Sequence, residues 1–373
     1  MDALVTDVHI RCAVHGLRAL GRAGRTVVAM GPGRLAPGRW SSHAAARAIA
    51  PDVVHDPAGY VAGVARVARE QGPLVVYPGL EESIDALLDG PLPAEARLPW
   101  PGTAPVRAVR DKASLPGLAA AAGLRTPEVY ARASAGELLA DKPPIPCVLK
   151  PVGKGRALHA PQVIESSERF EDILAALPAD EPLLVQERIA GELMAVAVVT
   201  DRDGAVVARF QQRARRTWPR EAGPSTVSVG VEADPDLVGA AARLLAEAGY
   251  WGLAELQLLD DGRAPAVIDV NPRFYGSLPL AVASGVNLPA VWHAVATGEA
   301  VAPHAPYRTG VTYRWLEGDL YNALHGMPRA GFERVPAPRV GAMWAGDDPV
   351  ASTLLAGRAL GIWLRRRLPG GRG

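Results

Sequence analysis

Two short apolar segments, each containing one acidic residue, constrain the fold of this chain more than any other stretch. The first, residues 253–259, contains Glu255, and the second, residues 266–270, contains Asp269. The turn-forming sequence DDGR separates them, which predicts a β-hairpin. Asn271 follows Asp269 at a spacing of two, so both side chains leave the same face of a strand. We therefore expect three oxygen-bearing side chains to converge on one point.

Acidic side chains inside apolar strands need a partner, because burying an ionised carboxylate alone is costly. A salt bridge to Arg263 or Arg273 would account for one acid, but not for two acids and an amide on adjacent strands. Carboxylate and amide oxygens, together with substrate phosphates, are the ligands that Mg²⁺ prefers. We therefore predict that Glu255, Asp269 and Asn271 bind Mg²⁺, with Mn²⁺ as an alternative metal.

The residues around this hairpin closely resemble the metal-binding hairpin of the ATP-grasp enzymes. The resemblance rests on the sequences GLAELQLL and AVIDVNPRFYGS and on SLPLAVASGVNLPAVWHAVATGEA, which overlaps the second and continues it. In that family, an acid on one strand and an acid–x–Asn–Pro–Arg run on the next hold Mg²⁺ against ATP. The resemblance implies the same metal ligands, and it implies that Arg273 contacts the transferred phosphoryl group or the acyl-phosphate.

Length and composition are typical of a soluble protein of two or three domains. The chain has 373 residues, of which 49% are hydrophobic and 21% charged, and domains average ~150 residues. The formal net charge of +1 gives no indication of nucleic-acid binding. Cys12 and Cys147 have no CxxC or His-rich neighbourhood, so we expect neither a zinc site nor a disulfide framework.

Other features favour a cytoplasmic protein that does not contact a membrane. Two free thiols fit a reducing compartment. The N-terminal sequence MDALVTDVHI lacks the basic and apolar regions of a signal peptide, and no apolar run is long enough to span a bilayer. A homodimer is compatible with the sequence.

Strands alternate with helices over the first hundred residues, which predicts a parallel α/β sheet. Apolar runs at 3–6, 26–30 and 74–77 are typical of its strands. No GxGxxG follows the first strand, and the GPG sequence after the second does not open a helix, so we predict that this sheet does not bind NAD. In the ATP-grasp family a Rossmann-like domain comes first, and YPGLEESIDAL at 77–87 resembles its end.

The resemblance implies an α/β protein of three units. We place a Rossmann-like domain at residues 1–107, the ATP-grasp domain at 108–300 and a small C-terminal extension at 301–373. The ATP-grasp domain is expected to consist of two α+β subdomains, 108–182 and 183–300, that clasp ATP between them.

Two lysines and a glycine loop are the candidates for binding nucleotide phosphate. Lys112 precedes a helix and the sequence GLRTP, a pattern that resembles the start of the ATP-grasp region, although a solvated helix start has the same sequence. Lys150 ends a short strand and leads into a loop whose Gly153 and Gly155 leave backbone N–H groups free for phosphate. The Walker A spacing is absent. VLKPVGKGRAL resembles the family's phosphate-binding lysine and its flexible lid, which implies that Lys150 contacts the α- or β-phosphate.

The sequence VQERIAGE, residues 185–192, lies between two apolar strands. It fits a surface hairpin with solvated acids, and it also resembles the family's interdomain hinge, which receives adenine through backbone hydrogen bonds. The resemblance assigns nucleotide contacts to Gln186, Glu187, Ile189 and Glu192. Glu187 would mark the hinge and Ile189 the adenine edge, while the Glu192 carboxylate would accept both ribose hydroxyls.

The basic sequence RFQQRARRTWPR occupies residues 209–220. A nucleic-acid surface is disfavoured by the near-neutral total charge, and a solvated strand and loop remains an alternative. Arginine forks bind carboxylates and phosphates in a bidentate manner. Arg213 and Arg215 are expected to share one strand face near the reacting groups and to act there together with Lys150 and Arg273.

The function implied by the resemblance is that of an ATP-dependent carboxylate–amine ligase. Such an enzyme phosphorylates a small-molecule carboxylate, condenses the acyl-phosphate with an amine, and releases ADP and phosphate. Two alternatives remain open: a bicarbonate-using, carboxylase-type ATP-grasp enzyme, and an ATP-binding regulatory protein without turnover. The intact set of predicted metal ligands and Arg273 argues against the second. No GxSxG or HExxH motif indicates another chemistry.

Overall fold

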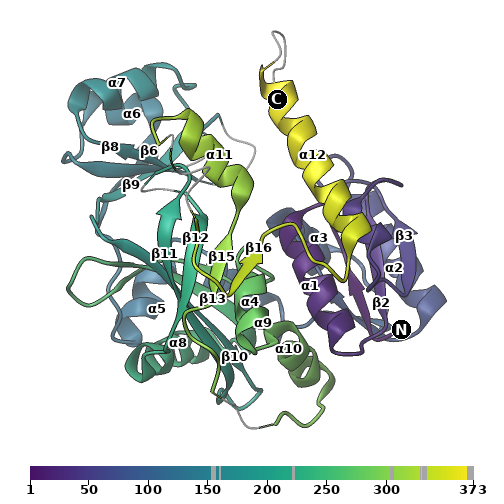
Figure 1. The fold of residues 1–373 in the computed structure, drawn as a ribbon. Helices are drawn as coiled ribbons and strands as arrows, with labels where there is room; N and C mark the ends of the chain where they lie inside the picture. The colour runs from purple at the N-terminus through teal and green to yellow at the C-terminus, as the bar shows by residue number, and fades with distance from the viewer. Residues whose placement is uncertain are drawn as a thin grey trace.

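A computed structural model gives the fold of the chain as three β-sheets flanked by helices (Figure 1). The residues that it describes are 1–152, 157–158, 161–220, 223–302, 306–327, 329 and 334–367, with side chains as far as residue 362. In Figure 1 the N-terminal sheet lies on the right, the seven-stranded sheet in the centre and the four-stranded sheet at the upper left.

The N-terminal sheet has five parallel strands in the order β3-β2-β1-β4-β5, which confirms the predicted α/β class. Its strand order reverses between β1 and β4, where sheets of this type open a crevice at the carboxyl ends of the strands. The elements are β1 (Ala3–Val5), α1 (Arg11–Arg22), β2 (Val27–Gly31), η1 (Pro37–Trp40), β3 (Ala46–Ile49), α2 (Pro57–Gln71), β4 (Leu74–Tyr77), α3 (Glu81–Asp89), β5 (Ala96–Arg97) and α4 (Thr103–Arg110).

The second sheet has four antiparallel strands in the order β6-β9-β7-β8. Phe170 and Leu174 of its helices are buried against it. A capping box at Ser134 and Glu137 begins the first of these helices. The elements, with the preceding helix, are α5 (Leu115–Ala121), β6 (Val129–Ser134), α6 (Ala135–Ala140), β7 (Cys147–Pro151), β8 (Gln162–Ile164), α7 (Ser167–Ala175) and β9 (Pro182–Glu187).

The third sheet has seven strands in the order β14-β13-β10-β11-β12-β15-β16. Among the described residues, no single helix is long and apolar enough to cross a bilayer, although α9 and α10 meet the length and composition criteria as a pair bent by 94°. The elements are β10 (Glu192–Thr200), β11 (Val206–Thr217), β12 (Ser225–Val231), α8 (Pro235–Glu247), β13 (Gly252–Asp260), β14 (Ala266–Asn271), α9 (Leu278–Ser284), α10 (Leu288–Thr297), β15 (Thr312–Arg314) and β16 (Arg339–Gly341).

Strands β9 and β10 belong to different sheets, so the alternative of a surface hairpin across residues 185–192 is wrong. Residues 188–191 are instead the short connection between the four-stranded and the seven-stranded sheets. Backbone groups of this connection therefore lie where the two sheets meet.

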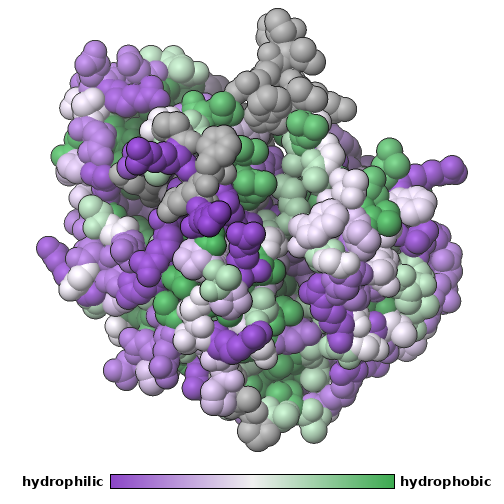
Figure 2. Space-filling view, viewed as in Figure 1, coloured by the Kyte–Doolittle hydropathy of each residue, from purple (hydrophilic) through white to green (hydrophobic). Residues whose placement is uncertain are grey.

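The C-terminal residues belong to two parts of the molecule. Strands β15 and β16 extend the seven-stranded sheet, so the predicted boundary at residue 300 falls between elements of one sheet. Helix α11 (Leu316–Leu324) follows β15, and α12 (Pro349–Arg367) lies against the N-terminal unit (Figure 1). Apolar side chains stay exposed on α12 (Figure 2). Leu360 is one of them and is 56% exposed.

A buried ion pair connects the start of α12 to α1. Arg18 Nε lies 2.7 Å from Asp348 Oδ2, and the two side chains are only 4% and 1% exposed. Arg18 also donates to the Met343 carbonyl and to Ser352 Oγ, at 3.0 and 2.9 Å. Ser41 Oγ donates to the same Asp348 oxygen at 2.7 Å. The Arg18 guanidinium and the Asp348 carboxylate are thus paired with each other and hydrogen-bonded to their neighbours, so neither charge is buried alone.

Asp348→Ala is expected to lower the free energy of unfolding by about 3–5 kcal/mol, because it leaves the Arg18 guanidinium buried without its anion. Urea denaturation measures this loss. Asp347→Ala is the matched control: its carboxylate pairs with Arg22 at 2.7 Å, but the side chains are 46% and 34% exposed, so the cost should be about 1 kcal/mol or less. Equal effects of the two substitutions would contradict this account of the C-terminal attachment.

Candidate active site

The hairpin of β13 and β14 brings the three predicted metal ligands together. Glu255 pairs with Asn271 across the two strands. The amide nitrogen of Asn271 lies 3.3 Å from Glu255 Oε2 and 3.4 Å from Asp269 Oδ2. Period-two alternation places Asp269 and Asn271 on one face, so the side chains meet for the reason that the sequence indicated. Their role as metal ligands stays a prediction.

The salt-bridge alternative for these acids does not fit the structure. Arg273 donates from Nε to Glu81 Oε1 at 2.6 Å and from Nη1 to the Phe274 carbonyl at 3.1 Å. Within the described parts of the chain, neither Glu255 nor Asp269 forms an ion pair, and Arg263 contacts neither. Two carboxylates without a cation, beside an amide, fit Mg²⁺. Because the described chain contains no group of three or more His, Cys, Asp or Glu that could hold a metal ion, substrate oxygens or water must complete such a site.

Burial raises the pKa of Glu255 to about 7, an effect that the nearby Asp269 charge reinforces. Hydrogen bonding from Gln257, whose amide nitrogen lies 3.5 Å from Glu255 Oε2, opposes the shift, as does the more distant charge of Arg273. The carboxyl group is therefore half ionised near neutral pH. Positive charge in the cleft would favour its ionised form.

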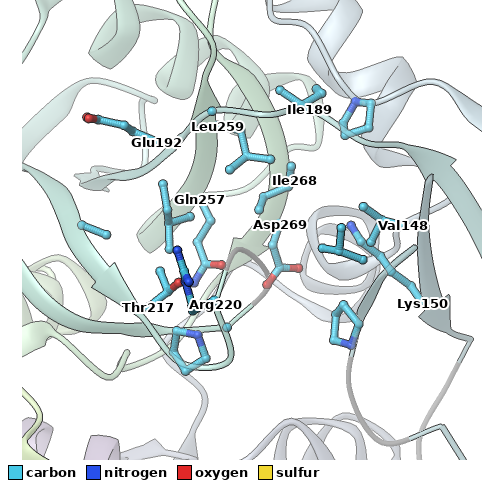
Figure 3. A pocket seen from close by; sticks show the side chains of 18 of the residues that line it. Val148, Lys150, Ile189, Glu192, Thr217, Arg220, Gln257, Leu259, Ile268 and Asp269 are labelled. Carbon is cyan, nitrogen blue, oxygen red and sulfur yellow. The ribbon is translucent and has the colours of Figure 1, made fainter. Parts of the chain in front are cut away.

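A cavity of about 690 Å³ lies between the four-stranded and seven-stranded sheets. This volume is in the range of pockets that bind small ligands. Figure 3 shows Asp269 and Lys150 facing each other across it. Apolar side chains from both sheets and from the connection between them line one part of the cavity: Val148, Ile189, Leu259 and Ile268.

Both predicted phosphate-binding lysines line this cavity. Burial lowers the pKa of Lys150 to about 8; the charge of Lys112 adds to the shift and that of Asp269 opposes it. In the described residues neither lysine has an ion-pair partner. Two cations held near each other without an ion-pair partner favour a negatively charged ligand. Gly153 and Gly155 lie outside the described residues.

The connection between the sheets presents backbone groups and one amide to the cavity. Ile189 is 7% exposed, and within the described chain its N–H and C=O have no hydrogen-bond partner. Gln186 is also 7% exposed, and its Oε1 is buried without a partner. Glu187 is held in place because its Oε2 accepts from the Glu128 N–H at 3.2 Å and its N–H donates to the Glu128 carbonyl at 2.8 Å.

Glu192 lies at the edge of the cavity, with its carboxylate directed away from Asp269 in Figure 3. Its side chain is 60% exposed and lies 3.4 Å from Arg213 Nη1. A carboxylate in this position remains accessible to hydroxyl groups of a ligand.

The expectation that Arg213 and Arg215 share a strand face is wrong. The pairing of β11 with β12 shifts between Ala214 and Arg216, so Arg215 is the extra residue of a β-bulge and the alternation of faces is interrupted. Arg213 lies outside the cleft and binds Asp260 Oδ2 at 2.8 Å. Arg215 is exposed and lines the cavity.

Several residues of the cleft were not identified from the sequence. Gln257 and Leu259 follow Glu255 at spacings of two and four, so strand alternation alone would have found them. Ile268 enters the cleft because β14 has its own register shift opposite Gln257 and Leu258, which has no sequence signal. The remaining cleft residues without a predicted role include Val148, Thr217, Arg220 and Tyr275, whose buried hydroxyl has no partner.

A second cavity of about 690 Å³ adjoins the first on the side of the N-terminal sheet. The two share Lys112, Asp269, Asn271 and Arg273. The second cavity is also lined by charged residues of both neighbouring units, including Glu81, Asp85, Arg110 and Arg132, beside apolar residues such as Val129 and Leu184. The metal-ligand cluster and Arg273 therefore lie where the two cavities meet.

Comparison with known proteins agrees with this architecture. Residues 179–319 match the family described as ATP-grasp in the biosynthetic pathway with Ter operon. A search of curated proteins found no match. Among solved structures, Campylobacter jejuni biotin carboxylase in complex with β,γ-ATP is similar, with a TM-score of 0.64 and 16% identity over 83% of this chain and 74% of that one.

Two further structures have the same fold. N5-carboxyaminoimidazole ribonucleotide synthetase from Thermus thermophilus matches with a TM-score of 0.62 and 16% identity, over 83% of this chain and 81% of its own. The third structure is the biotin carboxylase domain dimer of Hydrogenobacter thermophilus 2-oxoglutarate carboxylase, bound to MgADP, ADP and bicarbonate. It matches with a TM-score of 0.59 and 16% identity, over 83% of this chain and 73% of that one. The family match over residues 179–319, the shared fold and the hairpin with its acids and amide together support the assignment of this chain to the ATP-grasp superfamily.

Proposed function

We propose that this protein is an ATP-dependent ligase that phosphorylates a small-molecule carboxylate and condenses the acyl-phosphate with an amine. The main observation in support is that Glu255, Asp269 and Asn271 converge at the junction of two cavities. One cavity has the apolar walls and unpaired lysines that suit a nucleotide, and the other has the charged walls that suit a polar substrate. The reacting groups of both would meet at the junction, beside Arg273.

The adenine ring is proposed to lie between the apolar side chains near residues 188–191. The backbone of Ile189 and the unpartnered Gln186 Oε1 supply hydrogen bonds there, since the exocyclic amino group of adenine is a donor. Glu192 is proposed to accept the ribose hydroxyls at the open edge. This orientation directs the phosphates toward Lys150 and Lys112, whose positive charges match them.

The proposed reaction has two steps. A carboxylate oxygen attacks the γ-phosphorus, the bond from that phosphorus to the β–γ bridging oxygen breaks, and ADP leaves. An amine nitrogen then attacks the carbonyl carbon, the bond from this carbon to the phosphate oxygen breaks, and the nitrogen loses a proton. Mg²⁺ bound by Glu255, Asp269 and Asn271 would neutralise phosphate charge. Lys150 and Lys112 would hold the β- and γ-phosphates, and Arg273 would stabilise the phosphoryl group during transfer.

Carboxylation with bicarbonate is the second candidate, because two similar solved structures are carboxylase domains and one of them is described with bicarbonate bound. That reaction has the same first step, with bicarbonate as the acceptor. A regulatory ATP-binding protein would keep the nucleotide cavity without turnover. One similar structure is described as a dimer, and on that ground a homodimer of this chain stays a prediction.

A coupled assay of ADP release, over a matrix of amino acids and small carboxylic acids, tests the proposal. Mass spectrometry should identify a product whose mass equals that of the carboxylate plus the amine less one water. ADP release that requires bicarbonate, with no need for a carboxylate–amine pair, would favour the second candidate. Absence of ADP release from protein that binds Mg-ATP would favour the regulatory alternative.

Lys150 should make ATP binding depend on pH. With a pKa of about 8, the side chain is charged at pH 7 and mostly neutral at pH 9. Since phosphate binds the charged form, the Kd for Mg-ATP should rise about tenfold between these pH values, and binding near pH 8 should take up part of a proton. Titration calorimetry in buffers of different ionisation enthalpy measures both effects. Lys150→Arg stays charged and should remove the dependence; an unchanged slope would contradict the phosphate contact.

A further inference from the structure

We propose that a small polar cavity beside the metal-ligand cluster binds a carboxylate group of the amine substrate, with Arg11 as its anchor. The inference rests on the proposed ligase function and adds the chemical class of the amine, which is one that carries its own carboxylate. The cavity measures about 60 Å³ and opens toward the main cleft, with which it shares Glu255, Gln257 and Gly276. It is therefore an extension of the cleft next to the reacting groups.

Arg11 provides the positive charge of this cavity. It is the first residue of α1, so the N-terminal unit contributes it to a cavity otherwise walled by the seven-stranded sheet and the segment after β14. Its guanidinium carbon lies 4.3 Å from the centre of the Trp315 ring. Within the described residues Arg11 forms neither an ion pair nor a hydrogen bond. A cation–π contact orients the guanidinium but leaves its charge unneutralised, so an anion can still bind.

Two other arginines near the cleft, Arg216 and Arg273, are paired with acids. Arg216 donates to both oxygens of Asp319, at 2.8 and 2.9 Å. Arg273 is bonded to Glu81 at 2.6 Å. Glu255 lines the same small cavity as Arg11, but the two form no ion pair. Within the described residues, Arg11 therefore differs from Arg216 and Arg273 in having no acidic partner.

Two buried polar side chains in the wall of the small cavity have unmet hydrogen-bonding capacity. Ser228 is 0% exposed, and its Oγ has no partner. Gln212 is 6% exposed; its Nε2 donates to Ser277 Oγ at 2.6 Å, and its Oε1 has no partner. Buried polar groups are normally satisfied, so both point to a ligand or water in this space.

A carboxylate matches the Arg11 guanidinium and the Ser228 hydroxyl in size, charge and hydrogen bonding, whereas Gln212 Oε1 is an acceptor and can pair only with a donor, such as water or the amine of the substrate. The guanidinium can donate two parallel hydrogen bonds to the carboxylate, and the Ser228 hydroxyl can donate a third. The cavity accommodates a group of a few atoms, so the rest of the substrate must extend through the opening at Glu255 and Gln257. An amine placed there lies beside the metal-ligand cluster, where the acyl-phosphate forms in the proposed reaction.

Acetate is the probe for this subsite, used on the full chain saturated with Mg²⁺ and β,γ-imido-ATP. The melting temperature should rise with acetate in a saturable manner, because a ligand that binds the native state stabilises it. Arg11→Gln should weaken acetate binding at least tenfold, and Arg11→Lys should weaken it less. Arg47→Gln is the matched control, since this guanidinium lies 4.7 Å from the Trp40 ring and lines none of the cavities above.

The design separates failure of the subsite from failure of the proposed function. The shift caused by the nucleotide analogue should persist in every variant and reports a folded ATP site. Ser228→Val fills the cavity without altering Arg11 and should also weaken acetate binding, which covers the case in which Arg11→Gln does not fold. Any of three results would overturn the proposal. Wild type and Arg11→Gln could bind acetate equally, wild type could show no saturable rise in melting temperature with acetate, or inorganic phosphate could raise the melting temperature where acetate does not.

An activity arm links the subsite to turnover. In the ADP assay, glycine and other amino acids should be better amine substrates than glycinamide and its analogues, which lack the carboxylate. Arg11→Gln should raise the KM for the amino acid at least tenfold and remove this preference. A preference retained by Arg11→Gln would overturn the assignment even if the ligase reaction itself is observed.

Discussion

Asp269→Asn is expected to reduce ATP turnover by roughly 10²–10³-fold while the protein stays folded, an effect of the size seen when one electrostatic contact to a transition state is removed. The substitution removes one negative charge and almost no volume. Asn271 Nδ2 lies 3.4 Å from Asp269 Oδ2, so the amide retains a neighbour of similar shape. What is lost is the charge that the proposed Mg²⁺ requires. The ADP assay gives the turnover, and thermal unfolding confirms the fold.

Asp261→Asn is the matched control for this experiment. Asp261 lies in the turn of the same hairpin, but its carboxylate binds Arg125 at 2.8 Å and lines neither large cavity. Its replacement should leave turnover within about twofold of wild type, since the carboxylate lies away from both large cavities. Normal turnover by Asp269→Asn, or an equal loss in both variants, would contradict the metal assignment.

Arg273→Lys is expected to reduce turnover by roughly 10²–10³-fold, because a lysine cannot reproduce the planar, bidentate geometry of a guanidinium at a transferring phosphoryl group. Burial disfavours the charge of Arg273, but the neighbouring Glu81 holds its pKa above the ordinary value, so the side chain stays charged. The Kd for Mg-ATP should change only a few-fold, since the adenine and the lysines bind the nucleotide. Steady-state kinetics and calorimetry measure the two quantities separately.

Glu81→Gln distinguishes the charge of Arg273 from its orientation. Glu81 accepts from Arg273 Nε at 2.6 Å and from Arg110 Nε at 2.9 Å, so it holds both arginines at the junction of the cavities. A neutral amide keeps a hydrogen-bond acceptor in place, and we expect a smaller loss of turnover, on the order of tenfold. Wild-type turnover in Arg273→Lys would remove Arg273 from the proposed reaction.

The parts of the structure that follow local rules could be predicted from the sequence. The hairpin of β13 and β14 is visible because strand alternation and a turn sequence are both local, and Asp269 and Asn271 share a face for the same reason. The parallel N-terminal sheet is visible because helical and strand periodicities alternate along the chain.

The parts that depend on irregular pairing or on long-range contacts could not be predicted. A β-bulge shifts Arg215 into the cleft and leaves Arg213 outside it, and another admits Ile268; neither has a signature in the residues concerned. The Arg273–Glu81 and Arg18–Asp348 pairs join residues 192 and 330 positions apart. Charged residues alone do not reveal which partner they will meet after folding.

The acyl-phosphate is the central claim, and transfer of an oxygen isotope tests it most directly. The protein is incubated with ATP, Mg²⁺, an amine and the reacting carboxylic acid labelled with ¹⁸O in its carboxylate, in unlabelled water and bicarbonate. If a carboxylate oxygen attacks the γ-phosphorus, one ¹⁸O must appear in the inorganic phosphate for each amide formed, and mass spectrometry of the phosphate detects it. Phosphate without ¹⁸O, formed in step with the amide, would contradict the account.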